Sequence, residues 1–203
     1  MGMPRLLLAT NNTAKVREYL LPLQDIPYEI VTLSDVGIDL VVSETGKTLE
    51  ENASIKARAY ASASNLTALA DDSGLEVDAL GGEPGALSAR YGGEGVTDRE
   101  RLDFLLSKLV LVPWEKRAAR FRCVIAIATP EGVVELCQGE CHGIITFEPK
   151  GEGGFGYDPI FFLSEMGKTM AELTLEEKNE ISHRGKAARR ARQILERVSK
   201  RNE

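Results

Sequence analysis

The chain has 203 residues, 43% of them hydrophobic, which allows one large domain or one domain with two lobes around a buried core. The net charge of −6 argues against a general affinity for nucleic-acid polymers, and no apolar run approaches the roughly 20 residues that span a bilayer. The N-terminus has no apolar segment with a cleavage site, so we expect a cytoplasmic protein without membrane attachment.

Short apolar runs predict strands, and Thr-x-x-Glu capping boxes at 48–51, 97–100 and 174–177 predict three helix starts. The predicted elements, in chain order, are a strand over 5–10, a helix within 11–23, a strand over 28–33, a helix over 48–64, a short strand over 68–70, a helix from 97 to before 113, two long strands over 118–129 and 133–147, an extended segment over 157–163 and helices to the C-terminus. Residues 71–74 are predicted to turn the chain, and residues 182–185 to interrupt the last helices. This order indicates an α/β protein with a mixed sheet and flanking helices, in a single domain over 1–203.

Three glycine-containing segments imitate nucleotide-binding motifs. Gly46-Lys47-Thr48 and Gly167-Lys168-Thr169 look like the end of a P-loop, but both lack the glycine expected five residues earlier. Residues 151–156 match G-x-G-x-x-G, yet they lead into an extended segment instead of a helix, which disfavours a Rossmann site. Neither of the two histidines lies in a sequence context that is recognisable as a serine or cysteine catalytic triad.

The cysteines could be reduced thiols or part of a zinc site, and the basic residues cluster near the C-terminus. Cys123, Cys137 and Cys141 are loosely spaced and indicate reduced thiols, and the spacing disfavours a zinc site from Cys137, Cys141 and His142. A basic cluster near the C-terminus indicates a solvated helix face for most of its members. These members are Arg184, Lys186, Arg189, Arg190, Arg192, Arg197, Lys200 and Arg201.

Polar residues follow the first strand and precede the second helix. Residues 10–15 lie where a strand leads into a helix, so free N–H groups, Asn12 and Lys15 suit a polyphosphate, although Asn and Thr are also ordinary caps. Glu44 lies in a polar turn before a helix that places Asn52 and Lys56 on one face. A solvated helix face is the alternative interpretation of that pair.

Asp71 and Asp72 directly follow a buried apolar strand. Adjacent carboxylates repel each other unless a cation or hydrogen-bond donors compensate. Strand ends are also where α/β proteins build sites. A magnesium ion bound by carboxylates and substrate phosphates is the favoured explanation, and an Asx-type turn is the alternative.

Eight sequence blocks follow one another from Leu8 to about Leu195. They are Ala9-Thr10-x-Asn12-x-x-Lys15-x-x-Glu18, Glu44-Thr45-Gly46, Glu51-Asn52-Ala53-x-x-Lys56-Ala57, Ala70-Asp71-Asp72-Ser73-Gly74-Leu75, Pro84-Gly85, Ser88-Ala89-Arg90-Tyr91, Gly153-Gly154-Phe155-Gly156-Tyr157-Asp158-Pro159 and Lys178-x-x-Ile181-Ser182-His183-Arg184-Gly185. Together they resemble the inosine/xanthosine triphosphate pyrophosphatases, the Ham1-like family of housecleaning nucleotide hydrolases. Asn11 stands where many members have glycine.

The resemblance implies a mixed-sheet α/β fold with two lobes around a central cleft, and usually a homodimer. It implies Mg²⁺-dependent hydrolysis of non-canonical purine nucleoside triphosphates (dITP or ITP, XTP or dXTP) to the monophosphate and pyrophosphate, which removes them from the nucleotide pool. Asp72 is implied as the proton acceptor for the attacking water and, with Glu44, as a metal ligand. The implied substrate-binding residues are Thr10, Asn11, Asn12, Thr13, Ala14, Lys15 and Lys56 at the triphosphate, Ser73 beside it, and Phe155, Gly156, Tyr157, Asp158, Lys178, His183 and Arg184 at the base.

The chemistry of these residues agrees with the implied roles. Cations must neutralise a triphosphate before water approaches phosphorus, and a carboxylate can take the proton of that water. Phe155 can stack on any purine, whereas a donor such as Arg184 aimed at O6 would favour hypoxanthine and xanthine over adenine. The sequence predicts neither the ranking of the substrates nor the way in which guanine is excluded.

Three other functions remain as alternatives. A Maf-like enzyme for pyrimidine or modified nucleotides is disfavoured by residues 155–158 and 182–184. A non-catalytic nucleotide sensor is disfavoured because both Glu44 and Asp72 are present. A nucleic-acid module built on the basic C-terminal helix is disfavoured by the acidic charge balance.

Overall fold

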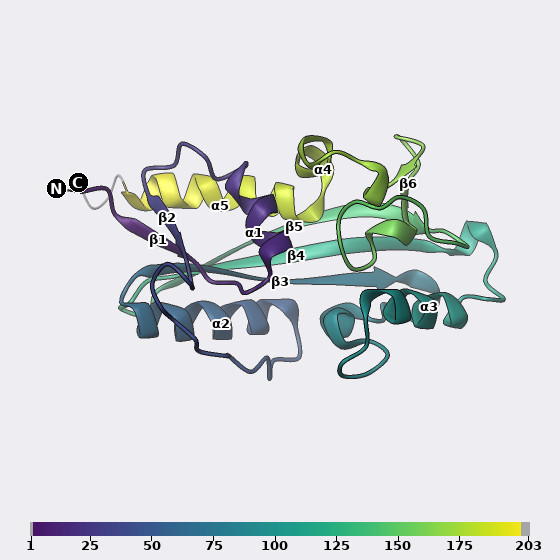
Figure 1. The fold of residues 1–203 in the computed structure, drawn as a ribbon, viewed down its shortest axis with the longest axis horizontal. Helices are drawn as coiled ribbons and strands as arrows, with labels where there is room; N and C mark the ends of the chain where they lie inside the picture. Colours follow the sequence, from purple (N-terminus) through teal and green to yellow (C-terminus); the bar gives the residue numbers. More distant parts are fainter. Residues whose placement is uncertain (1, 200–203) are drawn as a thin grey trace. The chain divides into compact units, whose positions relative to one another are not determined.

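A seven-stranded mixed sheet organises the computed structural model, which describes residues 2–199 (Figure 1). Its strand order is β2-β1-β3-β4-β5-β6-β7; β1 pairs in parallel with β2 and β3, whereas β6 pairs antiparallel with β5 and β7. The helices and strands are β1 (Arg5–Leu8), α1 (Thr13–Leu20), β2 (Glu29–Thr32), α2 (Leu49–Ser64), β3 (Thr67–Val77), α3 (Asp98–Lys108), β4 (Ala118–Ala128), β5 (Val134–Ile145), β6 (Phe161–Leu163), β7 (Lys168–Thr169), α4 (Leu175–Ile181) and α5 (His183–Ser199). The predicted α/β class with a mixed sheet and flanking helices is confirmed. Within residues 2–199, no helix has the length and apolar character that crossing a membrane requires.

The chain divides into two compact units, each assembled from separated segments. Unit 1 contains the chain up to Asp72, then Cys123–Gly139 and the segment from Arg184 onward. Unit 2 contains Ser73–Arg122 and Glu140–His183. Strands β3, β4 and β5 each contribute residues to both units, so the chain passes from one unit to the other inside strands.

Unit 1 is a sheet covered by helices on both faces (Figure 1). On one face, Leu6 of β1 and Leu69 of β3 share a core with Tyr19 of α1 and with the small side chains Ala187 and Ala188 of α5. On the other face lies α2, which buries alanines at 53, 57 and 61. Small helix residues allow α2 to approach the sheet closely.

Unit 2 has its own core, in which Leu102 and Leu105 of α3 pack with Leu75 and Val77 of β3. Gly74 of β3 makes a close backbone approach, because a Cβ added there would lie 2.3 Å from the carbonyl oxygen of Gly85.

Ser88 belongs to the short helical turn η2 (Gly85–Arg90) and ties it to β3. Its hydroxyl accepts from the Leu75 N–H at 2.8 Å and donates to the Gly85 carbonyl at 2.6 Å. The strand is therefore fixed directly after its two aspartates.

Two sequence predictions about the backbone are wrong. Residues 71–74 do not turn the chain, because β3 continues through them to Val77. The interruption near the C-terminus is also shorter than predicted, since only Ser182 is extended and His183–Gly185 form the first turn of α5. The capping boxes at Thr97 and Thr174 are confirmed, whereas at Thr48 only the Thr48 half forms and Glu51 accepts from the Lys47 N–H instead.

The cysteines are reduced thiols, and most of the described members of the basic cluster lie on a solvated helix face, as the sequence predicted. All three cysteines are free thiols. Side chains at 186, 189, 190 and 197 are exposed, as predicted for a solvated face, whereas Arg184 is buried. Lys200 and Arg201 lie outside the described residues.

Candidate active site

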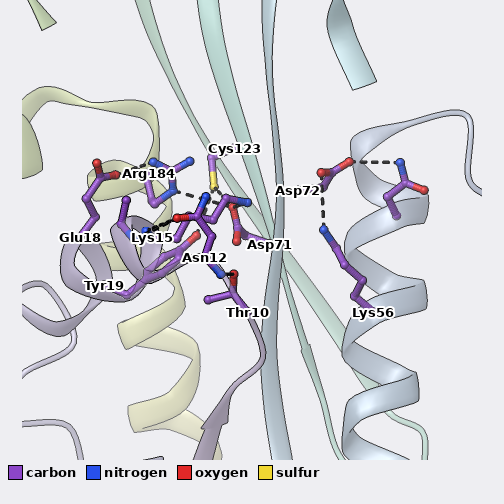
Figure 2. A network of polar contacts seen from close by, with 12 residues as sticks. Thr10, Asn12, Lys15, Glu18, Tyr19, Lys56, Asp71, Asp72, Cys123 and Arg184 are labelled. Atoms are coloured by element: carbon purple, nitrogen blue, oxygen red, sulfur yellow. Dashed lines mark hydrogen bonds and ion pairs between the residues drawn. The ribbon is translucent and has the colours of Figure 1, made fainter. Parts of the chain in front are cut away.

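Asp71 and Asp72 extend to opposite faces of β3 (Figure 2). Successive side chains of a strand alternate between the two faces, so adjacent carboxylates need not face each other. Asp71 faces α1 and α5, and Asp72 faces α2 (Figure 2). Each carboxylate has cations on its own side, which explains why the strand continues through a pair of residues that normally disfavours it.

Asp71 is the anion of a buried ionic network. Its Oδ2 lies 2.8 Å from Lys15 Nζ and 3.8 Å from Arg184 Nε, and Arg184 also forms an ion pair with buried Glu18. Burial alone would raise the pKa of Asp71, but Lys15 and Arg184 outweigh it and hold the pKa well below its usual range. The same environment raises the pKa of the Tyr19 hydroxyl, through burial first and the Asp71 charge second. Lys15 and Arg184 therefore favour the ionised form of Asp71.

Asp72 lies among groups of both charges on the other face. Its Oδ1 is 3.5 Å from Lys56 Nζ, and the same nitrogen is 2.5 Å from Glu44 Oε1. Burial and the nearby Glu44 charge raise the pKa of Asp72, although Lys56 opposes them. Burial would lower the pKa of Lys56, but Asp71, Asp72 and Glu44 raise it, so the lysine stays charged. Carboxylates whose pKa values are pushed apart are typical of catalytic sites.

Asn52 is a site residue for which the sequence predicted no role. It is fully buried, accepts from the Gly46 N–H at 2.8 Å and donates to Asp72 Oδ2 at 3.1 Å. The interpretation of Asn52 and Lys56 as a solvated helix face is therefore wrong, since Lys56 has only 14% of its side chain exposed. The spacing of four residues was the available signal, because it places both side chains over the same part of the strand.

Residues 10–15 contain the end of the loop that follows β1 and the first turn of α1. Asn12 is the N-cap, and its Oδ1 accepts from the N–H groups of Ala14 and Lys15 at 2.9 and 3.2 Å. Thr10 Oγ1 accepts from the Asn12 N–H at 3.2 Å, while Asn11 and Thr13 are exposed. The cap interpretation of Asn12 is therefore correct in this structure, and it gives the segment a fixed shape beside the Lys15 ammonium group (Figure 2).

In unit 2, Asp158 holds the glycine-rich loop. Its Oδ2 accepts from the Phe155 N–H at 2.8 Å and from Lys178 Nζ at 2.5 Å. Lys178 Nζ also lies 5.1 Å from the centre of the Phe155 ring. Gly154 has φ +71°, and a Cβ there would lie 2.0 Å from the Asp158 carboxylate, so only glycine fits.

Three further predicted base-pocket residues of unit 2 have structural contacts. Tyr157 is buried and donates to the Ser88 carbonyl at 3.0 Å, and the Gly156 N–H donates to Asp98 at 2.9 Å. The buried His183 ring stacks on Phe121 with 4.6 Å between ring centres and 15° between planes.

The structure brings together the predicted residues within each unit. In unit 1, Lys56 lies with Glu44 and Asp72 on one face of β3, and Lys15 and Arg184 lie with Asp71 on the other. Unit 2 joins residues 155–158 with Lys178 and contains Ser73, which is half-buried in β3.

The donor set on the α2 side suits a divalent cation. Glu44 and Asp72 direct carboxylate oxygens at one ammonium nitrogen, so both side chains already converge on a single positive charge. Mg²⁺ prefers oxygen ligands and is commonly held by one or two carboxylates together with substrate phosphates. These two residues fit such an ion.

Comparison with known proteins gives one consistent result. Residues 6–194 match the model of the Ham1 family. A protein of Geobacter sulfurreducens named dITP/XTP pyrophosphatase is 52% identical over 91% of this chain and 93% of its own length. One of Bacillus subtilis with the same name is 45% identical over 96% of this chain and 98% of its own. The solved structure of a HAM1 protein from Coxiella burnetii is 40% identical, covers 95% of this chain and 98% of its own, and superposes with a TM-score of 0.86.

Proposed function

This chain belongs to the Ham1 family, and from that membership we propose that it is a dITP/XTP pyrophosphatase. It hydrolyses non-canonical purine nucleoside triphosphates to the monophosphate and pyrophosphate, and so removes them from the nucleotide pool. The observation that carries this proposal is the convergence of Glu44 and Asp72 on the Lys56 ammonium group. A non-catalytic sensor would have no need of a buried carboxylate with a raised pKa at that point.

The charges of unit 1 suit cleavage between the α- and β-phosphates. Lys15 and Lys56 neutralise the triphosphate and stabilise the pyrophosphate leaving group, with the capped segment from Thr10 to Ala14 beside them. Asp72 accepts the proton of the attacking water, which its raised pKa favours. When bound by Glu44 and Asp72, Mg²⁺ would supply positive charge to the phosphate oxygens and acidify water.

The base is recognised by residues 155–158, Lys178, His183 and Arg184, with Ser73 touching the substrate near Asp72. Phe155 supplies a stacking face that every purine can use. Asp158 is committed to the Phe155 N–H and to Lys178, which supports a role in shaping this loop. Arg184 forms ion pairs with Glu18 and Asp71. Donation from Arg184 to the O6 atom of the purine base stays a prediction.

Product analysis over a panel of nucleotides tests the proposed function. Purified protein with Mg²⁺ is incubated with dITP, XTP, GTP, ATP and dTTP, and products are separated by ion-exchange chromatography. We expect monophosphate and pyrophosphate, with the highest kcat/KM for dITP or XTP. Diphosphate and orthophosphate as first products, or a preference for dTTP, would contradict the proposal, and the second result would favour a Maf-like activity.

Three organisational features belong to the same proposal. The two units act as a single pyrophosphatase domain, the active form is a homodimer, and the enzyme works in the cytoplasm, where nucleotide pools are replenished. Light scattering coupled to size-exclusion chromatography measures the oligomer directly. A mass of one chain at working concentration would rule out the dimer.

A further inference from the structure

The side-chain amide of Asn52 joins the two segments that carry the candidate metal ligands. Its Nδ2 donates to Asp72 Oδ2 at 3.1 Å, and its Oδ1 accepts from the Gly46 N–H at 2.8 Å. Gly46 lies two residues after Glu44, in the segment that precedes α2. One planar group of fixed size therefore connects the Glu44 segment to the Asp72 carboxylate.

This connection decides which oxygen of Asp72 is available. With Oδ2 bonded to Asn52, the other oxygen, Oδ1, is the one that lies 3.5 Å from Lys56 Nζ, beside Glu44. Metal ligands are commonly oriented by hydrogen-bonded neighbours of this kind, and removal of such a neighbour typically lowers metal affinity or activity 10- to 100-fold.

We propose that Asn52 is a positioning residue that sets the spacing and orientation of Glu44 and Asp72 for a divalent cation. The inference rests on the pyrophosphatase function proposed above, because binding of a metal ion by Glu44 and Asp72 is part of that proposal. Asn52 contacts the carboxylate and the loop, and acts through them.

The chemistry of the position requires an amide. Asn carries a donor group and an acceptor oxygen on the same rigid amide, and both form hydrogen bonds here. Aspartate would keep the acceptor for Gly46 but would present a second carboxylate to Asp72. Burial makes that repulsion strong, because Asn52 is 0% exposed.

The Gly46 loop presses closely on the amide. A Cβ at Gly46 would lie 2.7 Å from Asn52 Oδ1 and 2.6 Å from Glu51 Cβ, so glycine is needed for the contact. Because the contact is tight, a change at Asn52 is transmitted to the loop that carries Glu44.

Asn52→Asp provides the test, with Asn65→Asp as the matched control. Asn65 is the exposed C-cap of the same helix, so the control makes the same chemical change far from the carboxylate pair. Mn²⁺ serves as the probe, and electron paramagnetic resonance measures free Mn²⁺ over protein without nucleotide. We expect a Kd for Mn²⁺ that is 10- to 100-fold weaker in Asn52→Asp and within about 2-fold of the parent in Asn65→Asp.

Kinetics separate positioning from a purely structural role. In the folded variant, kcat for dITP should fall at least about 10-fold and recover partly as Mg²⁺ is raised, while KM for dITP changes less than about 3-fold. A structural role would lower the folded fraction and leave the Mn²⁺ Kd of the remaining protein unchanged. If Asn52→Asp does not fold, Asn52→Ser, whose hydroxyl keeps one of the two bonds, takes its place.

Two results would overturn the inference. The first is a folded Asn52 variant with parental Mn²⁺ affinity and parental kcat. The second is a parent protein that binds no Mn²⁺, with or without a non-hydrolysable dITP analogue. Because the Mn²⁺ measurement uses no substrate, a protein whose Mn²⁺ affinity depends on Asn52 but that releases no pyrophosphate would contradict the proposed function alone.

Discussion

Asp71 and Asp72 are the same amino acid at consecutive positions, yet their partners give them different properties. Asp71 is enclosed by Lys15 and Arg184 and stays ionised, whereas burial and Glu44 make the charged form of Asp72 less favourable. The difference comes from the face of β3 on which each side chain lies. Substitution of each residue should therefore change a different measurable property.

Asp72→Asn should remove activity and preserve folding. The change keeps the shape of the side chain but removes the proton acceptor and one carboxylate, so kcat should fall by about 100-fold or more. The urea midpoint should stay near that of the parent, because a neutral group relieves the cost of a buried charge. Near-parental turnover would assign the proton acceptor to another carboxylate.

Asp71→Asn should instead destabilise the protein. The partly buried Lys15 and the buried Arg184 would lose their common anion, and breaking a buried ion pair on one side typically costs about 3–5 kcal/mol. Urea unfolding followed by circular dichroism measures the loss. A free energy of unfolding within about 1 kcal/mol of the parent would show that Glu18 alone neutralises the cluster.

Arg117 is a second residue whose role depends on burial. The residue is 2% exposed, and its guanidinium group donates to the backbone carbonyls of Val112, Leu109 and Thr146, with Thr146 at 2.6 Å. It thereby closes the C-terminal end of α3 against the end of β5.

Arg117→Lys should be costly because an ammonium group cannot reproduce the planar fork of donors. Leaving buried carbonyls without partners costs about 1–3 kcal/mol for each group, so we expect a loss of at least about 2 kcal/mol in the free energy of unfolding. Arg120→Lys is the control, since Arg120 forms a partly exposed ion pair with Glu76 and should change stability by about 1 kcal/mol or less. Equal losses in the two variants would contradict this account.

At the scale of elements, β3 depends on one close contact between backbones. Gly74→Ala would place a methyl group against the Gly85 carbonyl, and a backbone atom cannot move aside as a flexible side chain can. We expect a destabilisation of about 1–3 kcal/mol, measured by thermal or urea unfolding. Parental stability would mean that η2 shifts freely on the strand.

Local signals in the sequence predicted most elements, but the continuation of β3 was beyond them. The Thr97 and Thr174 capping boxes were recognisable because a helix start uses residues three apart. Asp71 and Asp72 suggested a turn, since their cations come from residues 15, 56 and 184, far away in the chain. Tertiary contacts outweighed local propensity at that point.

In the candidate site, too, the sequence indicated some residues but not their tertiary contacts. The family blocks pointed to Glu44, Lys56 and Asp72, and these residues do lie together. No pattern in the sequence could reveal that the Asn52 amide bonds in two directions, or that Arg184 lies in a helix turn paired with Glu18. Such contacts depend on which faces of separate elements meet.

At the scale of the whole molecule, each unit is discontinuous in sequence. The core of unit 1 combines Leu69 of β3 with Ile125 of β4 and with Ala188 of α5, which come from three separate segments. A fragment of residues 1–122 keeps the whole of β3 but loses two of these three segments.

That fragment should not fold. Its β1 and β3 would expose the apolar face that α5 covers, and β3 would lose part of its neighbouring strand β4. The remaining core is too small to offset chain entropy. We expect collapsed amide dispersion in its nuclear magnetic resonance spectrum, with the full chain well dispersed. A folded fragment would show that α1, α2 and the first strands suffice for unit 1.

The alternation along β3 has a consequence for insertions and deletions. Because side chains of a strand repeat every two residues, one residue added just before Asp71 would exchange the faces of the two aspartates while leaving the pair itself unchanged. The carboxylate that now neutralises Lys15 would turn toward α2, and the one beside Lys56 would turn toward Arg184. The number of residues that precede Asp71 in β3, odd or even, therefore decides which aspartate faces α2, although the two residues are chemically identical.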